Sequence, residues 1–429
     1  MSSNQIQSLS GFRDFFPEEL SSRRHIFSAW RRVCERYGFS EYDGPPLEPL
    51  ELYTRKSGDG IVGQLYEFED KGGRPVALRP EMTPTFARMI ALRAAALPKP
   101  IRWFSIPQLF RYERPQRGRL REHFQLNMDI VGETNFLADA EIIAAGIDAL
   151  RELGLNKSHI RVRVSDRRLM VSLLDAIGVA GANHHAVFNT LDRLDKRPSD
   201  EIAKELRGIV SDQEVAGRIL ELTERSISQL QDEFADHESV VKAADDLVGV
   251  LGCLEKSGLE GYAEFDASLV RGLAYYTGTV FEIWEREGQL RAICGGGRYD
   301  DLLQALGGVD LPAVGFGMGD VVLSELLKEH QLMPAEVGCV DDYIVCVSEE
   351  ERATALKVAH SLRDSGRRVT QDLQSRKVSR QLKAANQAGA ARAIILGAEE
   401  LSRGMVLVKD LESGEEQEVP LDSLTDRKE

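Results

Sequence analysis

Arginine is concentrated in one short segment of a chain that is acidic overall, with a formal net charge of −15. The segment FRYERPQRGRLRE carries five arginines in the eleven positions from Arg111 to Arg121, with Glu113 among them. A guanidinium group is planar and makes paired, charge-assisted hydrogen bonds to phosphate oxygens. An acidic protein must meet a polyanion through such a local patch, because binding depends on neutralising phosphates. The segment therefore indicates a phosphate site, with a solvated surface loop as the alternative.

A regular alternation of polar and apolar residues follows directly, in HFQLNMDIVGE. A period of two places Gln125, Asn127 and Asp129 on one face of a strand and the apolar residues on the other. We expect two strands joined by the loop RPQRGRLRE, so that Arg111 and Glu113 lie beside this polar face. That neighbourhood favours a binding site over a loop that is merely solvated.

The length of 429 residues suggests two or three domains, each able to bury its own core. The five cysteines form no CxxC pair, so the sequence indicates neither a disulfide framework nor a zinc site, and a reducing cytosol fits best. The N-terminus lacks the pattern of a signal peptide, and no apolar run approaches membrane-spanning length. We therefore expect a soluble, cytoplasmic protein with no membrane partner.

The pattern in the first two thirds of the chain predicts strands framed by helices. Helical spacing of apolar residues predicts helices over 20–37 and 138–153. Strands are predicted in PVALRPEMT, IRWFSIPQLFRYE and HFQLNMDIVGE, and again in TGTVFEIWE, which returns through LRAICGGG as a hairpin. Residues 166–256 carry mostly helical, highly charged patterns. We interpret them as a helical insertion between two halves of a sheet domain.

Strand and helix patterns alternate beyond residue 340, which indicates a separate small α/β domain with parallel strands. Six basic residues lie close together in its sequence: Arg367, Arg368, Arg376, Lys377, Arg380 and Lys383. Such a cluster forms a local cationic patch that can contact nucleic-acid phosphates, in contrast to the acidic chain as a whole. For any one of these residues, a solvated helix face is an equally good interpretation.

Several motifs together resemble those of the histidyl-tRNA synthetases, a family within the class II aminoacyl-tRNA synthetases. FRYERPQRGRLREHFQ looks like motif 2 of class II, and LVRGLAYYTGTVFE, residues 269–282, resembles the histidine signature. GFRDFFPEE, LRPEMT and GGGRYDDLL match the same family. The resemblance covers nearly the whole chain, and it is the combination of motifs that makes it specific.

The resemblance implies an α+β fold with a class II synthetase-like catalytic domain on an antiparallel sheet, interrupted by the helical insertion. A C-terminal α/β anticodon-binding domain follows. The expected division is 1–165 for the first part of the catalytic domain, 166–256 for the insertion, 257–328 for the second catalytic part and 341–424 for the anticodon-binding domain. Motif 1, around Pro45, implies a homodimer, the commonest assembly of soluble proteins.

Roles for individual residues also follow from the resemblance. Arg111 and Arg271 are the expected catalytic residues, and ATP is expected to contact Arg111, Glu113 and Arg271. Contacts to histidine are implied for Glu81, Thr83, Gln125, Asp129, Tyr275 and Tyr276. Contacts to tRNA are implied for Arg114, Gln116 and Arg117. Without these motifs, the tyrosine pair would be interpreted as core filling and Glu81 as a surface carboxylate.

The expected chemistry explains these residue types. Attack of a carboxylate on the α-phosphorus of ATP needs alignment and positive charge around the phosphates. A neutral imidazole has one hydrogen-bond donor and one acceptor, so Asp129 together with the Tyr276 hydroxyl can reject apolar isosteres. ATP is the expected co-substrate and Mg²⁺ the expected metal, in a number that the sequence leaves open.

Motif 3 departs from the class II pattern. GFGMGDVVL, residues 315–323, places Val322 where an ATP-binding arginine is expected, and Ala274 replaces a common acidic residue of the histidine signature. Another cation must then take the place of that arginine, or adenylation is impaired.

The implied function is a histidine–tRNA ligase that forms histidyl-adenylate and then charges histidine tRNA. The alternative is a synthetase-like regulatory subunit of ATP phosphoribosyltransferase, which binds histidine without charging tRNA. Such paralogues usually lack the C-terminal domain and lose the tRNA loop, whereas this chain keeps both. A tRNA-sensing module without catalysis is a third interpretation, disfavoured because no further domain is attached.

Overall fold

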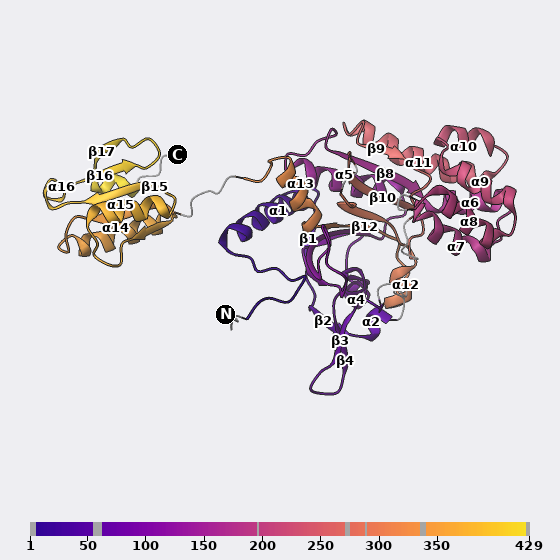
Figure 1. Ribbon diagram of the computed structural model, residues 1–429, viewed down its shortest axis with the longest axis horizontal. Helices are drawn as coiled ribbons and strands as arrows, with labels where there is room; N and C mark the ends of the chain where they lie inside the picture. Colours follow the sequence, from indigo (N-terminus) through magenta and orange to yellow (C-terminus); the bar gives the residue numbers. More distant parts are fainter. Residues whose placement is uncertain are drawn as a thin grey trace. The chain divides into compact units, whose positions relative to one another are not determined.

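The computed structural model describes residues 6–54, 62–194, 197–270, 275–287, 290–334 and 340–425 (Figure 1). The chain divides into two compact units, Met1–Met333 and Pro334–Glu429, and each contains its own β-sheet.

The first unit is built on a nine-stranded sheet that is antiparallel over most of its width. Six neighbouring strands form the antiparallel part, and two short outer strands pair in parallel with its ends. The order along the sheet is β1 (Ser40–Glu41), β5 (Ile101–Ser105), β7 (Glu122–Val131), β12 (Ala313–Gly319), β11 (Cys294–Arg298), β10 (Thr279–Glu285), β8 (Ile160–Asp166) and β9 (Ala263–Phe265). Strand β6 (Gln108–Phe110) pairs with the first half of β7.

One face of this sheet is covered by helices α1 (Pro17–Arg36), α5 (Phe136–Arg151) and α13 (Asp320–Glu329). The alternation in β7 has the predicted effect, since Leu126, Met128 and Ile130 are buried in this core. Helix α1 starts at Pro17, whose fixed φ suits the first turn of a helix, and Trp30 lies on its buried side. The helices predicted over 20–37 and 138–153 are confirmed, each beginning two or three residues earlier than expected.

Two of the predicted strands are shorter than expected. In PVALRPEMT, strand β4 (Pro75–Leu78) ends before Pro80, and α4 (Thr83–Arg93) begins at the end of the motif, with Pro84 in its first turn. IRWFSIPQLFRYE breaks into β5 and β6 around Pro107. Proline has no N–H to donate to a strand ladder, which explains both interruptions. Strand β4 lies between β2 (Leu47–Pro49) and β3 (Tyr66–Glu69) in a small second sheet.

The mostly helical pattern after residue 166 is confirmed by six successive helices, which cluster beside the β8 end of the central sheet (Figure 1). They are α6 (Arg167–Ala176), α7 (Gly181–Leu191), α8 (Ser199–Val210), α9 (Gln213–Thr223), α10 (Ile227–Glu233) and α11 (Glu238–Lys256). Asp166, Asp212 and Ser226 cap three of them by accepting backbone N–H groups. The hairpin predicted next is also present, as β10 and β11.

The second unit has a five-stranded sheet in the order β14 (Val369–Gln371), β13 (Val340–Cys346), β15 (Ala390–Leu396), β16 (Met405–Asp410) and β17 (Glu416–Pro420). The first three strands are parallel, as the alternating pattern predicted. Helices α14 (Arg352–Asp364) and α15 (Val378–Gln387) pack in two separate cores, to which alternate residues of β13 contribute. No described helix in either unit is both long and apolar enough to span a membrane.

Candidate active site

A row of glycines lies on the face of the central sheet that α5 leaves open. We call it the glycine floor; it consists of Gly295 and Gly297 of β11 and Gly315 and Gly317 of β12. The register pairs Gly315 of β12 with Asp129 of β7 and with Gly297 of β11. A Cβ atom on Gly315 would collide with the Asp129 carboxylate. A Cβ atom on Gly317 would lie 2.7 Å from Cδ of the Gln125 side chain. Glycine is therefore required here so that the polar row of β7 can lie across the neighbouring strand.

Asp129 is the buried carboxylate at one end of this floor. Its side chain is 5% exposed and accepts a hydrogen bond from the hydroxyl of Tyr299, itself 3% exposed. Burial raises the pKa of Asp129 to about 7, although the Tyr299 hydrogen bond opposes the rise. Its other carboxylate oxygen accepts no hydrogen bond from any residue that the structure describes. That oxygen is available to a ligand with an N–H group.

Tyrosine rings surround this carboxylate. The Tyr275 ring lies 4.9 Å from that of Tyr276 and 6.1 Å from that of Tyr299, measured between centroids. Tyr276 lies over the glycine floor, since a Cβ atom on Gly297 would stand 2.9 Å from its Cδ1. The structure thus brings together Asp129, Tyr275 and Tyr276, as the sequence predicted. Tyr299 is an addition that sequence reasoning missed, although GGGRYDDLL was among the motifs.

Glu81 and Arg111 form the next part of the site. Glu81 is 7% exposed, and burial raises its pKa while the positive charge of Arg111 opposes that rise. Arg111 Nε donates to the Pro80 carbonyl oxygen at 2.9 Å, which fixes the guanidinium group beside Glu81. Thr83 is half-buried at the start of α4, two residues beyond Glu81. These three predicted residues therefore lie close together at the end of β6.

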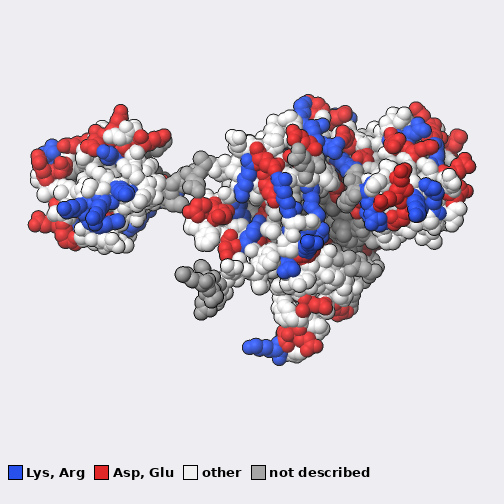
Figure 2. All heavy atoms as spheres, viewed as in Figure 1, with Lys and Arg blue, Asp and Glu red and all other residues white. Residues whose placement is uncertain are grey.

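A cavity of about 1350 Å³ opens next to these residues and runs along the glycine floor toward β8. Arg111, Glu113 and Gln125 of the predicted site line it, together with Gly295 and Gly317. Glu81, Thr83, Asp129 and the tyrosine pair are absent from its lining. Figure 2 shows Lys and Arg side chains gathered in the middle of the first unit, with Asp and Glu among them. The site thus has a closed polar end and an open, charged end.

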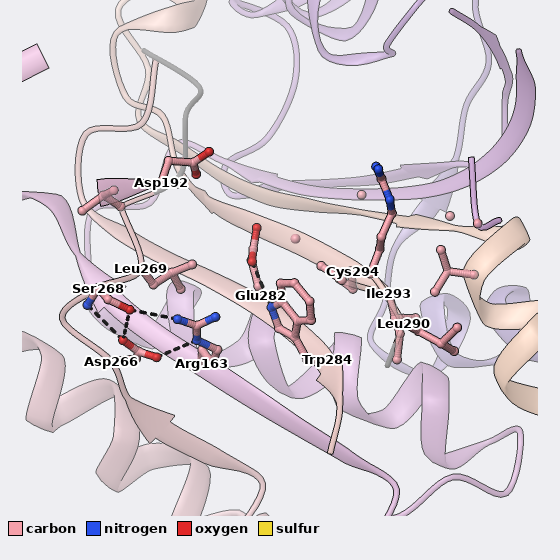
Figure 3. Close-up of a pocket in the computed structure, with 18 of the residues that line it drawn as sticks. Arg163, Asp192, Asp266, Ser268, Leu269, Glu282, Trp284, Leu290, Ile293 and Cys294 are labelled. Carbon is pink, nitrogen blue, oxygen red and sulfur yellow. Dashed lines mark hydrogen bonds and ion pairs between the residues drawn. The ribbon is translucent and has the colours of Figure 1, made fainter. Parts of the chain in front are cut away.

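One wall of the cavity consists of side chains to which sequence reasoning gave no role (Figure 3). Arg163 of β8 donates from Nε to Asp266 at 2.6 Å and from Nη2 to the Ser268 hydroxyl at 2.9 Å. Trp284 Nε1 donates to Glu282 at 2.9 Å, and both residues belong to β10. The sequence carried a signal for this wall that was not used, because IRVRVSD alternates arginine with valine at a period of two.

Comparison with known proteins decides the family. A family model described as histidyl-tRNA synthetase matches residues 11–320, and a model described as an anticodon binding domain matches residues 342–427. The chain belongs to the histidyl-tRNA synthetase family. It is therefore a class II aminoacyl-tRNA synthetase, and the resemblance drawn from its motifs is confirmed.

Relatives of this histidyl-tRNA synthetase match over almost their whole length. The histidine–tRNA ligase of Opitutus terrae is 44% identical over 421 residues, covering 97% of this chain and 96% of that protein. The crystal structure of histidyl-tRNA synthetase from Nostoc sp. PCC 7120 matches with a TM-score of 0.84 at 25% identity, covering 98% of each chain. The predicted α+β fold, with its antiparallel sheet and C-terminal anticodon-binding domain, is confirmed.

A structure described as an ATP phosphoribosyltransferase regulatory subunit/histidyl-tRNA synthetase, from Bacillus halodurans, also matches. Its TM-score is 0.72 at 24% identity, and the match covers 86% of this chain and 92% of that one. At this identity the likeness shows a shared fold and no more. It gives the regulatory interpretation less support than the ligase relatives give to catalysis.

The motif 2 loop of this synthetase is partly tied down. Glu113 is buried and forms an ion pair with Arg119. Arg117 is exposed and pairs with Glu325 at 3.0 Å and with Glu329, both on α13. The other two predicted tRNA contacts, Arg114 and Gln116, are exposed on the same loop.

The motif 3 departure is visible at the start of α13. Val322 is 8% exposed, lines the cavity and lies close to Gly118 of the motif 2 loop. Asp320, the first residue of the helix, pairs with Arg13 at 3.0 Å and accepts the Phe124 backbone N–H at 2.9 Å. The first turn of α13 therefore presents an apolar side chain to the cavity. Arg271 and Ala274 of the histidine signature lie outside the described residues.

The predicted cationic patch of the anticodon-binding domain is smaller than its sequence suggests. Three of its arginines form ion pairs with carboxylates: Arg367 with Asp342, Arg368 with Asp341 and Arg376 with Asp372. Lys377, Arg380 and Lys383 are exposed at a spacing of three along α15 and have no ion-pair partner among the residues described. In the described part of the chain no group of three or more His, Cys, Asp or Glu residues could hold a metal ion.

Proposed function

We propose that the chain activates L-histidine with ATP, releasing pyrophosphate, and transfers the histidyl group to the 3′ end of histidine tRNA, releasing AMP. The observation that carries this proposal is the glycine floor that joins a buried acceptor, Asp129, to an anchored guanidinium group, Arg111. A small polar amino acid and a nucleoside triphosphate fit these two ends. Their reacting groups would then meet between them.

Histidine selection rests on the closed end. The free oxygen of Asp129 would accept an imidazole N–H, and the Tyr276 hydroxyl would complete the pair. An apolar amino acid of similar size would leave these buried polar groups without hydrogen bonds. The free-energy cost of desolvating them would make its binding much weaker than that of histidine. The Tyr299 hydrogen bond holds the carboxylate in place before histidine arrives. Tyr275 would form the adjoining wall.

The backbone groups of histidine would lie between Glu81 and Gln125. The α-ammonium group would bind Glu81, and its positive charge would keep that buried carboxylate ionised. Thr83 and Gln125 would add neutral hydrogen bonds. The α-carboxylate would then point toward Arg111 and the α-phosphorus of ATP.

Adenylation needs stabilisation of the charge that develops on the α-phosphate. Arg111 is already held by the Pro80 carbonyl oxygen, so little reorganisation is required during the reaction. Arg271 would act on the same phosphate, as the family resemblance implies. Glu113 would accept from the adenine amino group, because a carboxylate paired with one arginine keeps further lone pairs.

Mg²⁺ would arrive with the phosphates of ATP, which it binds together with one or two protein carboxylates. Glu282 has the right chemistry for this role, because it lines the cavity and faces Gly295 across the sheet. The ion would neutralise charge on the β- and γ-phosphates. Binding of tRNA would use Arg114, Gln116 and Arg117 at the acceptor end, and the exposed face of α15 at the anticodon.

We further propose a cytoplasmic homodimer with the domain division 1–165, 166–256, 257–328 and 341–424. The family resemblance supports the homodimer and the domain division, the commonness of twofold assemblies also supports the homodimer, and the absence of a CxxC pair supports the cytoplasmic location. The regulatory interpretation remains the competing function, and the altered motif 3 is the feature that favours it. The arginines of the motif 2 loop and the anticodon-binding domain favour the ligase.

The test is histidine-dependent exchange of labelled pyrophosphate into ATP, followed by charging of histidine tRNA. We expect both activities in the wild type, and a fall in exchange of about 100-fold in Arg111→Ala, because one preorganised charge contact is lost. Arg207→Ala is the control, since Arg207 is exposed on α8 and its side chain bonds only the Ala203 carbonyl oxygen among the residues described. Histidine binding without exchange in the wild type would refute the ligase and favour the regulatory subunit.

A further inference from the structure

Three arginines from separate segments line the open end of the cavity. Arg111 follows β6, Arg119 belongs to the motif 2 loop, and Arg291 lies just ahead of β11. The first is held by the Pro80 carbonyl oxygen and the second by Glu113. Arg291 is exposed and makes neither a hydrogen bond nor an ion pair with any residue that the structure describes.

The three guanidinium groups are close enough to repel one another. Burial lowers the pKa of Arg119, and the positive charges of Arg291 and Arg111 lower it further. Gathering like charges around a cavity is unfavourable until an anion enters it. Glu113 offsets only part of this charge, because Arg119 already binds both of its oxygens. Neither Arg111 nor Arg291 has an ion-pair partner among the described residues, so these two guanidinium groups can bind an anionic ligand.

The backbone around Arg291 is anchored at the start of α13. The Gly319 N–H donates to the Ile293 carbonyl oxygen at 3.3 Å, and the Ile293 N–H donates to Ile283 at 2.8 Å. Arg291 is two residues from this anchored point, and Val322 is three residues beyond Gly319. Both side chains line the same cavity. A cation from the β10–β11 hairpin thus lies near the place where α13 offers only an apolar side chain.

We propose that Arg291 binds the β- and γ-phosphates of ATP and the pyrophosphate that leaves. The proposal rests on the proposed placement of ATP in the cavity. Arg291 presents a planar fork with no competing partner among the described residues, and such a fork suits paired hydrogen bonds to phosphate oxygens. In this chain, the positive charge that motif 3 lacks comes from the β10–β11 hairpin, whose backbone is hydrogen-bonded to the start of α13.

The test compares ligands that do and do not carry the outer phosphates, using the full-length chain. In pyrophosphate exchange, Arg291→Ala is expected to raise KM for ATP and for pyrophosphate about tenfold, the loss typical of one charge-assisted contact. KM for histidine and the inhibition constant of AMP stay within twofold, because neither ligand has a β-phosphate. Arg291→Lys keeps the charge without the fork and recovers part of the affinity. Arg207→Ala serves again as the matched arginine outside the cavity.

The outcomes separate this proposal from the proposed function. Absence of exchange in the wild type would overturn the placement of ATP itself. Exchange in the wild type, with unchanged KM for ATP and pyrophosphate in Arg291→Ala, would show that Arg291 is only a solvated side chain. Equal weakening of AMP and ATP would mean that the substitution distorts the whole cavity, which also overturns a role at the outer phosphates.

Discussion

The two ends of the glycine floor differ in burial and in the polar groups that they offer to a ligand. At the closed end, Asp129 is buried among tyrosines and already accepts one hydrogen bond. At the open end, Arg111, Arg119 and Arg291 line a cavity whose other walls carry both arginines and carboxylates, and among these three only Arg119 has an ion-pair partner in the described part of the chain. A dry pocket selects through the cost of unpaired polar groups, whereas arginines in an open cavity attract an anionic ligand through charge. Under the proposed function, selection of the amino acid and capture of the nucleotide would therefore depend on separate physical effects.

Asp129→Asn is expected to have the largest effect, because it removes the buried carboxylate of the closed end. We expect kcat/KM for histidine to fall about 1000-fold, because a buried site that relies on a polar pair discriminates strongly when that pair is lost. KM for ATP should change less than threefold, since Asp129 does not line the cavity. Steady-state pyrophosphate exchange measures both constants.

A second Tyr–Asp pair in the same unit supplies the control for that substitution. Tyr37 donates to Asp148 at 2.7 Å, on the far side of the unit's core from the glycine floor. Asp148→Asn should leave both KM values unchanged. An equal loss in the two variants would mean that Asp129 supports the fold and does not contact histidine.

Tyr299→Phe tests the closed end through the pH dependence of kcat/KM for histidine. Asp129 must be ionised to accept an imidazole N–H, so kcat/KM for histidine should fall as pH drops through about 7 in the wild type. The Tyr299 hydrogen bond lowers the pKa of Asp129, so its loss should move this fall to higher pH. At pH 7.5 we expect about a tenfold reduction.

The comparison of pH profiles isolates the enzyme's own titration. The imidazole of free histidine titrates near pH 6.5 and does so identically in every variant. A profile of Tyr299→Phe that moves to lower pH, or one that Tyr37→Phe reproduces, would contradict the assignment of the titration to Asp129.

Salt gives the smallest expected effect and needs no substitution. Raising NaCl from about 50 to 300 mM should raise KM for ATP about threefold, because exposed charges are screened over this range. KM for histidine should stay nearly constant, because Asp129 and Tyr299 are buried and salt ions screen buried groups much less. Parallel titrations of both substrates check this, and equal salt dependence would remove the distinction between the two ends.

Local sequence patterns predicted the elements well and the assembled site only in part. The period of two in HFQLNMDIVGE identified both faces of β7, because that signal lies within one strand. The prediction of continuous strands in PVALRPEMT and IRWFSIPQLFRYE was wrong, because the missing N–H of proline outweighed the β-type composition. The antiparallel pair β16 and β17 was not foreseen, although Ser413 and Gly414 carry a turn signal between them.

The partners of the site residues were harder to foresee. Tyr299 and Asp129 are separated by 170 residues. They meet because β11 and β7 lie on either side of strand β12, which carries Gly315 and Gly317. Arg163 and Asp266 lie 103 residues apart and meet across the parallel pair β8 and β9. Strand order and register create these pairs, and neither can be read from a short window of sequence. The motifs named the residues without giving their contacts.

The absence of side chains at Gly315 and Gly317 has an evolutionary consequence. Every substitution at these positions adds atoms where the Asp129 or Gln125 side chain already lies. A lineage therefore has no gradual route to a different amino-acid substrate through the floor of the pocket. Any drift in specificity would have to begin at its walls, at Tyr276 or Tyr299, where a smaller side chain leaves space behind.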